Sequence, residues 1–156
     1  MNTLFAEEIR PHHFMRDLAL GLLSEEDLAY RLTGRNPSLG ELFVEMGEVQ
    51  GAYTHSFATG RLDWGHRVLA PPATLTVDGL RAWFADHDVA METALGHFTE
   101  EELQAAPIDR GGGFVVSPFP QHEIYREAVY IFYGKLSVYL RALERDAGPA
   151  WEAWVG

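Results

Sequence analysis

The sequence predicts an all-α fold, an up-down four-helix bundle with a long crossover between helices 2 and 3. Four long segments carry apolar residues at steps of three and four, which is the period of one helix face. No segment shows the alternation of apolar and polar residues that predicts a strand. Residues 61–75, which include Gly65, Pro71 and Pro72, are too long for a tight turn and form the crossover.

Composition predicts one domain over residues 1–156 and sets limits on its partners. Hydrophobic residues make up 47% of the chain, and there is no cysteine to form disulfides. A net charge of −11 disfavours nucleic acid and anionic membranes, which both need clustered basic residues. The first ten residues lack a signal-peptide layout, and no apolar run approaches the ~20 residues of a membrane span. We therefore expect a cytoplasmic protein.

The first helix is expected from Ile9 to Leu23. Phe14, Leu18 and Leu22 recur at helical spacing and are expected to face the core, with Met15 beside them. Ser24 and the acidic residues after it are typical of a helix N-terminus, so a short helix should run from there to Leu32.

Ser38 and Glu41 form a capping-box pattern that should open the second long helix, and Gly60 should end it. Thr76 or Asp78 should cap the third. The two expected apolar stripes are Leu39, Leu42, Phe43, Met46, Val49, Tyr53 and Phe57 on the second helix, and Leu80, Phe84, His87, Met91, Ala94 and Phe98 on the third.

A short helical piece is expected from Thr99 to about Pro107, followed by a glycine-rich loop at residues 111–113. That loop is not a phosphate-binding loop, because no Gly-Lys-Ser/Thr follows it. The last long helix should run from Gln121 to Leu143. Trp151, Trp154 and Val155 should then pack back on the bundle.

Several segments together resemble the DinB/YfiT-like family of four-helix bundles. They are Leu23 to Leu28, Ser38 to Leu42 with Glu48 and Val49, Ile131 to Leu143, and the terminal Trp151 to Gly156. The resemblance covers nearly the whole chain. It implies a bundle with a long link between the second and third helices, often assembled as a homodimer.

The resemblance also implies a divalent metal, such as Zn or Ni, held by one His on helix two and a His-x-x-x-His pair on the last helix. Some members use it as thiol transferases. The matching positions here are Glu45, Ala128 and Phe132. Ala and Phe cannot bind metal, and such a site needs at least three protein ligands. We therefore expect a branch that lacks the three-histidine metal site, with no cofactor unless ligands have moved to residues such as Glu45, Glu48 and His87.

Titratable residues at inward-facing helix positions could line a polar pocket instead. Glu45 lies between Leu42 and Val49, Lys135 lies three residues after Phe132, and His87 sits within the third apolar stripe. A buried charge must be paired, so we expect Glu45 and Lys135 to lie within about 6 Å of each other and to fix the helix register. His13 could reach the same pocket.

Two further groups of residues could have a functional role. His122 begins a His-Glu-Ile-Tyr-Arg segment that is similar to a metal-binding helix motif. The motif needs a second His four residues on, and Arg126 occupies that position, so we do not expect His122 to bind metal. An aromatic set is expected in the core or at a dimer face: Tyr125, Tyr130, Tyr133, Tyr139 and Trp83.

The sequence leaves three functions open. The first is a non-catalytic or small-molecule-binding bundle with a degenerate metal site. The second is a metal-dependent transferase or hydrolase with relocated ligands. The third is a stress-response interaction protein that works through its helical surface. Function depends on the site rather than on the fold, so the geometry must decide among them.

Overall fold

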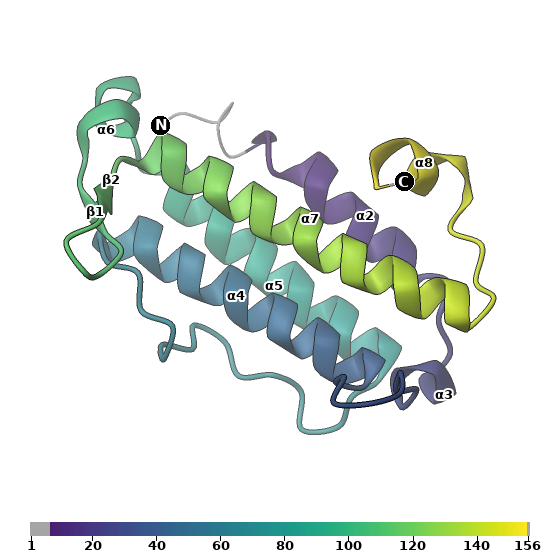
Figure 1. The fold of residues 1–156 in the computed structure, drawn as a ribbon. Coiled ribbons are helices and arrows are strands. Elements are labelled where there is room, and N and C mark those ends of the chain that lie inside the picture. The colour runs from purple at the N-terminus through teal and green to yellow at the C-terminus, as the bar shows by residue number, and fades with distance from the viewer. Residues whose placement is uncertain (1–6, 156) are drawn as a thin grey trace.

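The computed structural model describes residues 7–155 as a helical bundle with a small two-stranded sheet at one end (Figure 1). The long helices are α2 (Arg10–Leu20), α4 (Leu39–Thr59), α5 (Val77–Gly96) and α7 (Pro118–Ala142). The short elements are α3 (Glu25–Leu28), α6 (Glu100–Ala105), β1 (Ile108–Asp109), β2 (Val115–Val116) and α8 (Gly148–Trp154). The all-α bundle predicted from the sequence is confirmed.

Helices α4 and α5 run in the same direction, and the link between them returns along the length of the bundle (Figure 1). The residues in contact follow the same order along both helices, because Trp83 packs on Gly47 and His87 packs on Gly51, one turn further on. Helix α7 runs antiparallel to α4. This is the connectivity that the long crossover predicted.

The helix boundaries follow from the capping residues. The Ser38 hydroxyl accepts the backbone N–H of Glu41 at 3.2 Å, and the Glu41 carboxylate accepts the N–H of Ser38 at 2.7 Å. Gly60 ends α4 in the left-handed region with φ of 73°. At α5 the capping residue is Thr76, whose hydroxyl accepts the N–H of Gly79 at 3.0 Å. Each cap satisfies a backbone group that the helix end leaves free.

The predicted inward face of the first helix is wrong. Phe14 is 58% exposed, while His13, Arg16 and Leu20 are buried. Helix α2 is therefore rotated by about one residue from the orientation that its apolar spacing predicted. It also ends at Leu20 rather than Leu23.

Two other helices have boundaries that differ from the predicted ones. The short helix α3 ends at Leu28 instead of Leu32, because the backbone of Arg31 pairs with Ser38 in an isolated β-bridge. Helix α7 begins at Pro118, three residues before the expected Gln121. Pro118 lacks an N–H, which costs nothing in the first turn of a helix.

The sequence showed no strand, but the structure has a short antiparallel hairpin. Ile108 pairs with Val116 and Asp109 with Val115. Strands of two residues are too short for alternation to reveal them. Gly111, Gly112 and Gly113 form the tip, all with positive φ, which glycine adopts without strain.

The C-terminal turn packs back on the bundle in part. Trp151 is buried, and its indole N–H donates to the Ser137 hydroxyl at 2.9 Å. Trp154 stays half exposed and lies edge-on to His12. No helix within residues 7–155 is long and apolar enough to cross a membrane.

Candidate functional site

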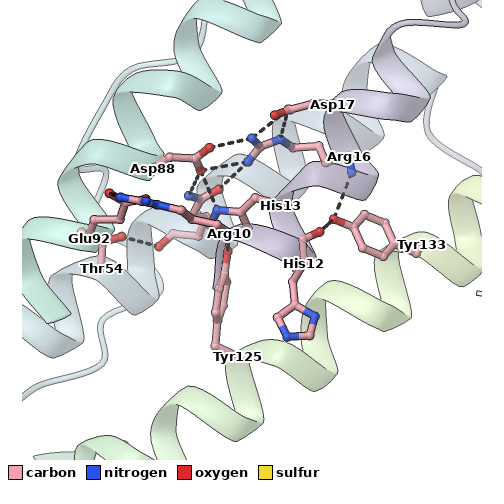
Figure 2. A network of polar contacts seen from close by, with 11 residues as sticks. Arg10, His12, His13, Arg16, Asp17, Thr54, Asp88, Glu92, Tyr125 and Tyr133 are labelled. Carbon is pink, nitrogen blue, oxygen red and sulfur yellow. Dashed lines mark hydrogen bonds and ion pairs between the residues drawn. The ribbon is translucent and has the colours of Figure 1, made fainter. Parts of the chain in front are cut away.

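A layer of polar side chains lies between the long helices, with Arg16 at its centre (Figure 2). Arg16 on α2 is only 1% exposed. Its guanidinium donates to both oxygens of Asp88 on α5, at 3.0 and 2.7 Å, and to Asp17 at 2.8 Å. Its central carbon, Cζ, lies over the Phe84 ring, 4.3 Å from the ring centre. A buried charge is stable only with such complete pairing.

Asp88 receives hydrogen bonds from three residues on two helices. Besides the two from Arg16, it accepts one from His13 Nδ1 at 2.7 Å and one from the Gln50 amide at 2.8 Å. Burial alone would raise the pKa of Asp88. The hydrogen bonds from His13 and Arg16 outweigh it and hold the pKa far below its usual range. Asp88 is therefore a permanent carboxylate.

His13 links this carboxylate to α7. Because the proton on His13 Nδ1 is donated in a hydrogen bond to Asp88, Nε2 of the neutral ring accepts the hydrogen bond from the Tyr125 hydroxyl at 2.7 Å. Burial lowers the pKa of His13 and raises that of Tyr125 well above its ordinary value. Both groups are thus neutral, and Tyr125 serves as a hydrogen-bond donor rather than a source of a phenolate.

A second tyrosine extends the layer. The Tyr133 hydroxyl accepts the backbone N–H of Arg16 at 3.1 Å and donates to the carbonyl of His12 (Figure 2). The layer therefore draws side chains from all four long helices: His13 and Arg16 from α2, Gln50 from α4, Asp88 from α5, and Tyr125 and Tyr133 from α7.

A groove of about 490 Å³ runs past the outer edge of this layer, between α2 and α5. The ion pair between Arg10 and Glu92, at 2.6 Å, lies along it. The groove is lined by Arg10, Pro11, His13, Phe14, Asp17, Asp88 and Glu92. Two of these residues, the buried His13 and the half-buried Asp88, form hydrogen bonds within the polar layer. These contacts join α2 to α5 and α7.

A different cavity, of about 330 Å³, lies beside Glu45 and Lys135 near the start of α4. Most of its lining is apolar, and the hydroxyl of Tyr139 donates to the carbonyl of Pro37 at 2.6 Å. The lining residues are Leu32, Asn36, Pro37, Leu42, Glu45, Lys135, Val138 and Tyr139. A mainly apolar cavity with a few polar groups is typical of small-molecule sites, and its volume lies at the small end of their range.

Glu45 and Lys135 lie as close as their helix positions predicted, with Nζ and Oε1 3.4 Å apart. The expectation that the pair is buried is wrong, because the Lys135 and Glu45 side chains are 47% and 49% exposed. The ammonium also lies 4.8 Å from the centre of the Phe132 ring. An exposed pair of this kind contributes little to stability.

The structure does not bring His87 and His13 to this cavity. His13 belongs to the polar layer. His87 is buried on α5, edge-on to Trp83 with ring centres 4.7 Å apart, and it packs on the backbone of Gly51. Within residues 7–155 neither ring nitrogen of His87 has a hydrogen-bond partner. Burial lowers the pKa of His87 to about 4, so its ring is neutral at pH 7.

We expect His87 to make the fold sensitive to mild acid. The unfolded chain takes up this proton near pH 6.5, whereas the folded chain does so only near pH 4. Acidification between these two values therefore protonates only the unfolded state and lowers the free energy of unfolding, by about 3 kcal/mol for this residue. Well above pH 6.5 His87 is neutral in both the folded and the unfolded state, so its titration does not lower the free energy of unfolding there.

Urea unfolding at several pH values between about 7.5 and 4 measures this loss directly. In the His87→Gln variant the loss should be smaller by about 3 kcal/mol, the share of this residue. A variant that keeps the whole loss would show that His87 does not titrate in this window. His122, with a pKa that burial lowers to about 4, remains as a second contributor in both proteins.

The three positions at which the resemblance implies metal ligands do not lie together as a ligand set. Glu45 pairs with Lys135, the Phe132 ring lies below the Lys135 ammonium, and Ala128 has no donor atom. Among the described residues, no group of three or more His, Cys, Asp or Glu side chains is placed to hold a metal. Of the possible relocated ligands, Glu48 pairs with Arg67 at 2.8 Å, and His87 packs against Trp83 and Gly51. These residues do not fit a metal centre.

Sequence reasoning missed the central residues of the polar layer, Arg16 and Asp88. One signal was present: residues 9, 13, 16 and 20 also share a helix face. That face carries Ile9, His13, Arg16 and Leu20, so counting only apolar residues ranked it below Phe14, Leu18 and Leu22.

Two solved bacterial structures share this fold. A DinB-like protein from Bacillus subtilis (YjoA) superposes with a TM-score of 0.74 at 16% identity, over 93% of this chain and 94% of that one. A DinB-like protein from Bacillus cereus gives 0.71 at 14% identity, with the same coverage of both chains. No family model and no curated protein matches the sequence. Across almost its whole length, the chain therefore has the fold of DinB-like proteins.

Proposed function

We propose that the protein is a small-molecule-binding bundle whose binding site is the cavity beside Glu45 and Lys135. The observation that carries the proposal is the combination of an apolar cavity with one weakly held pair of opposite charges at its edge. The polar layer around Arg16 supports the fold, and its groups are engaged with one another. Glu45 and Lys135 keep most of their hydrogen-bonding capacity.

The chemistry of the cavity favours a small amphipathic zwitterion. An apolar body would cover Leu42 and Val138, its carboxylate would bind Lys135, and its ammonium would bind Glu45. Separating the two side chains costs little, because exposed ion pairs are worth about 1 kcal/mol or less. Free apolar amino acids have this chemistry, and leucine is a suitable first probe.

Titration of ¹⁵N-labelled protein with leucine tests the proposal. We expect saturable shifts of the backbone amides of residues 32–45 and 135–139. Probes that keep the same body but lack one charge, 4-methylpentanoate and isoamylamine, should bind about tenfold more weakly. Lys135→Met and Glu45→Gln should each weaken leucine binding to a similar degree.

Glu48→Gln is the matched control, because Glu48 lies on the same helix and pairs with Arg67 outside the cavity. It should leave leucine binding unchanged. The proposal fails if leucine and its analogues cause no saturable shifts, or if Glu48→Gln weakens binding as much as Glu45→Gln.

We also infer that the protein works without the metal centre implied by the family resemblance. The side chains of Ala128 and Phe132 support this inference, since neither offers a ligand atom. The untagged protein, incubated with Zn, Ni and Mn salts and then desalted, should retain far less than one metal per chain by elemental mass spectrometry. Stoichiometric retention would instead support the alternative of a metal-dependent transferase or hydrolase.

Assembly as a homodimer remains a proposal. Tyr125, Tyr133 and Tyr139 are buried in the core, so the aromatic set as a whole does not form the dimer face. In the second half of α7, the large apolar residues Ile131 and Val138 are exposed on either side of Gly134. We expect Ile131→Glu to shift the mass seen by light scattering from dimer to monomer, and a wild-type monomer would contradict this.

A further inference from the structure

At the opposite end of α4 from the Glu45 cavity, Arg110 lies among aromatic rings. It follows β1, and the hairpin, the start of α7 and the end of α4 meet there (Figure 1). The guanidinium carbon lies 5.6 Å from the centre of the Tyr53 ring and 5.7 Å from that of Phe114. Trp64, from the link after α4, lies edge-on to Tyr53 at 5.8 Å.

Buried groups hold Arg110 in place. Its Nη1 donates to the side-chain oxygen of Gln121, and the Gln121 amide donates to the Ser56 hydroxyl at 2.8 Å. Gln121 and Ser56 are both fully buried. The backbone N–H of Arg110 also donates to the carbonyl of Phe114 at 2.9 Å, which fixes the hairpin. The guanidinium is therefore positioned before any ligand arrives, which lowers the entropy cost of binding.

No carboxylate within residues 7–155 forms an ion pair with Arg110, although the protein carries a net charge of −11. Asp109, its neighbour in sequence, instead accepts the backbone N–H of Gly111 at 2.8 Å. A guanidinium has five N–H donors, and those not used by Gln121 and Tyr53 remain for a ligand. At the rim, Trp64 is 61% and Phe114 55% exposed, so both offer ring surface to solvent.

We propose that Arg110, with Trp64 and Phe114, forms a second binding site, for a planar aromatic ring that bears an oxyanion. The anion pairs with the free edge of the guanidinium, and the ring stacks against the exposed aromatic side chains. Carboxylate and phosphate share this chemistry. The site is separate from the Glu45 cavity and does not depend on what that cavity binds.

Benzoate and phenyl phosphate are the probes, followed through the Trp64 indole N–H resonance and the amides of residues 110–114. We expect saturable shifts with both probes in the millimolar range, the stronger one identifying carboxylate or phosphate as the preferred anion. Acetate, which lacks the ring, and benzyl alcohol, which lacks the charge, should bind at least about tenfold more weakly.

Arg110→Gln and Trp64→Leu should each weaken benzoate binding by about tenfold. Arg61→Gln is the control. Arg61 pairs with Asp109 in the adjacent β-bridge, so this variant removes the same charge as Arg110→Gln from a position next to the site. It should change binding less than about twofold. The proposal is overturned if neither probe gives saturable shifts up to about 20 mM, or if Arg61→Gln acts as strongly as Arg110→Gln.

The folding of each variant is checked by its thermal transition. Should Arg110→Gln unfold the hairpin, Arg110→Lys keeps the charge but not the planar donor geometry and replaces it in the test. A several-fold loss with Lys supports the site, and unchanged binding would mean that only the charge matters, against the proposal.

Discussion

Replacement of Asp88 by alanine is expected to lower the free energy of unfolding by about 3–5 kcal/mol. The variant would leave the Arg16 guanidinium buried with only the half-exposed Asp17 as a charged partner. It would also remove the acceptor for His13 Nδ1 and for the Gln50 amide. Unpaired buried donors each add to the loss. Urea unfolding followed by circular dichroism measures it.

A double variant separates the cost of an unpaired charge from the value of the pair. Arg16→Met with Asp88→Leu removes both charges and fills much of the same volume. Apolar replacements of buried ion pairs are often neutral or stabilising, so the double variant should be more stable than Asp88→Ala alone. A loss below about 1 kcal/mol for Asp88→Ala would mean that the layer does not support the fold.

Substitution of Gly47 by alanine is expected to destabilise the protein by about 2 kcal/mol or more, although alanine favours helix. A Cβ at this position would lie 2.3 Å from two ring atoms of Trp83, which packs directly on the glycine. Neither Trp83 nor the nearby Phe84 can move far, because both are buried in the core. The interface of α4 and α5 would have to open.

Gly134 provides the control for this effect. It lies in the middle of α7, and nothing lies within 4 Å of the position of its Cβ. Gly134→Ala should therefore be neutral or stabilise by up to about 1 kcal/mol. Trp83→Leu should reduce the cost of Gly47→Ala in the double variant. Equal effects at the two glycines would refute the proposed close packing of Trp83 on Gly47.

The long helices and their caps could be predicted because their signals are local. Ser38 with Glu41, Thr76 and Gly60 act within a few residues of themselves, so the sequence alone reveals them. The face of the first helix could not be predicted in this way. Arg16 is buried because Asp88 neutralises it from a different helix, and nothing near Arg16 in sequence indicates that partner.

The candidate cavity was predictable only in part. Helical register correctly placed Glu45 close to Lys135. Their exposure depends on how α4 and α7 are rotated about their axes, and that rotation is set by the packing of other residues, such as Trp83 on Gly47. For the same reason, the apolar stripe that includes His87 gave no indication that its ring faces Gly51 rather than Lys135.

The central claim is that the polar layer around Arg16 and Asp88 stabilises the fold, whereas the Glu45–Lys135 pair contributes little to stability and is available to a ligand. Urea unfolding of Asp88→Asn beside Glu45→Gln tests it most directly, since each variant removes one negative charge with little change in shape. We predict a loss of about 3 kcal/mol for Asp88→Asn and less than about 0.5 kcal/mol for Glu45→Gln. Similar losses in both, or a larger loss for Glu45→Gln, would contradict the account.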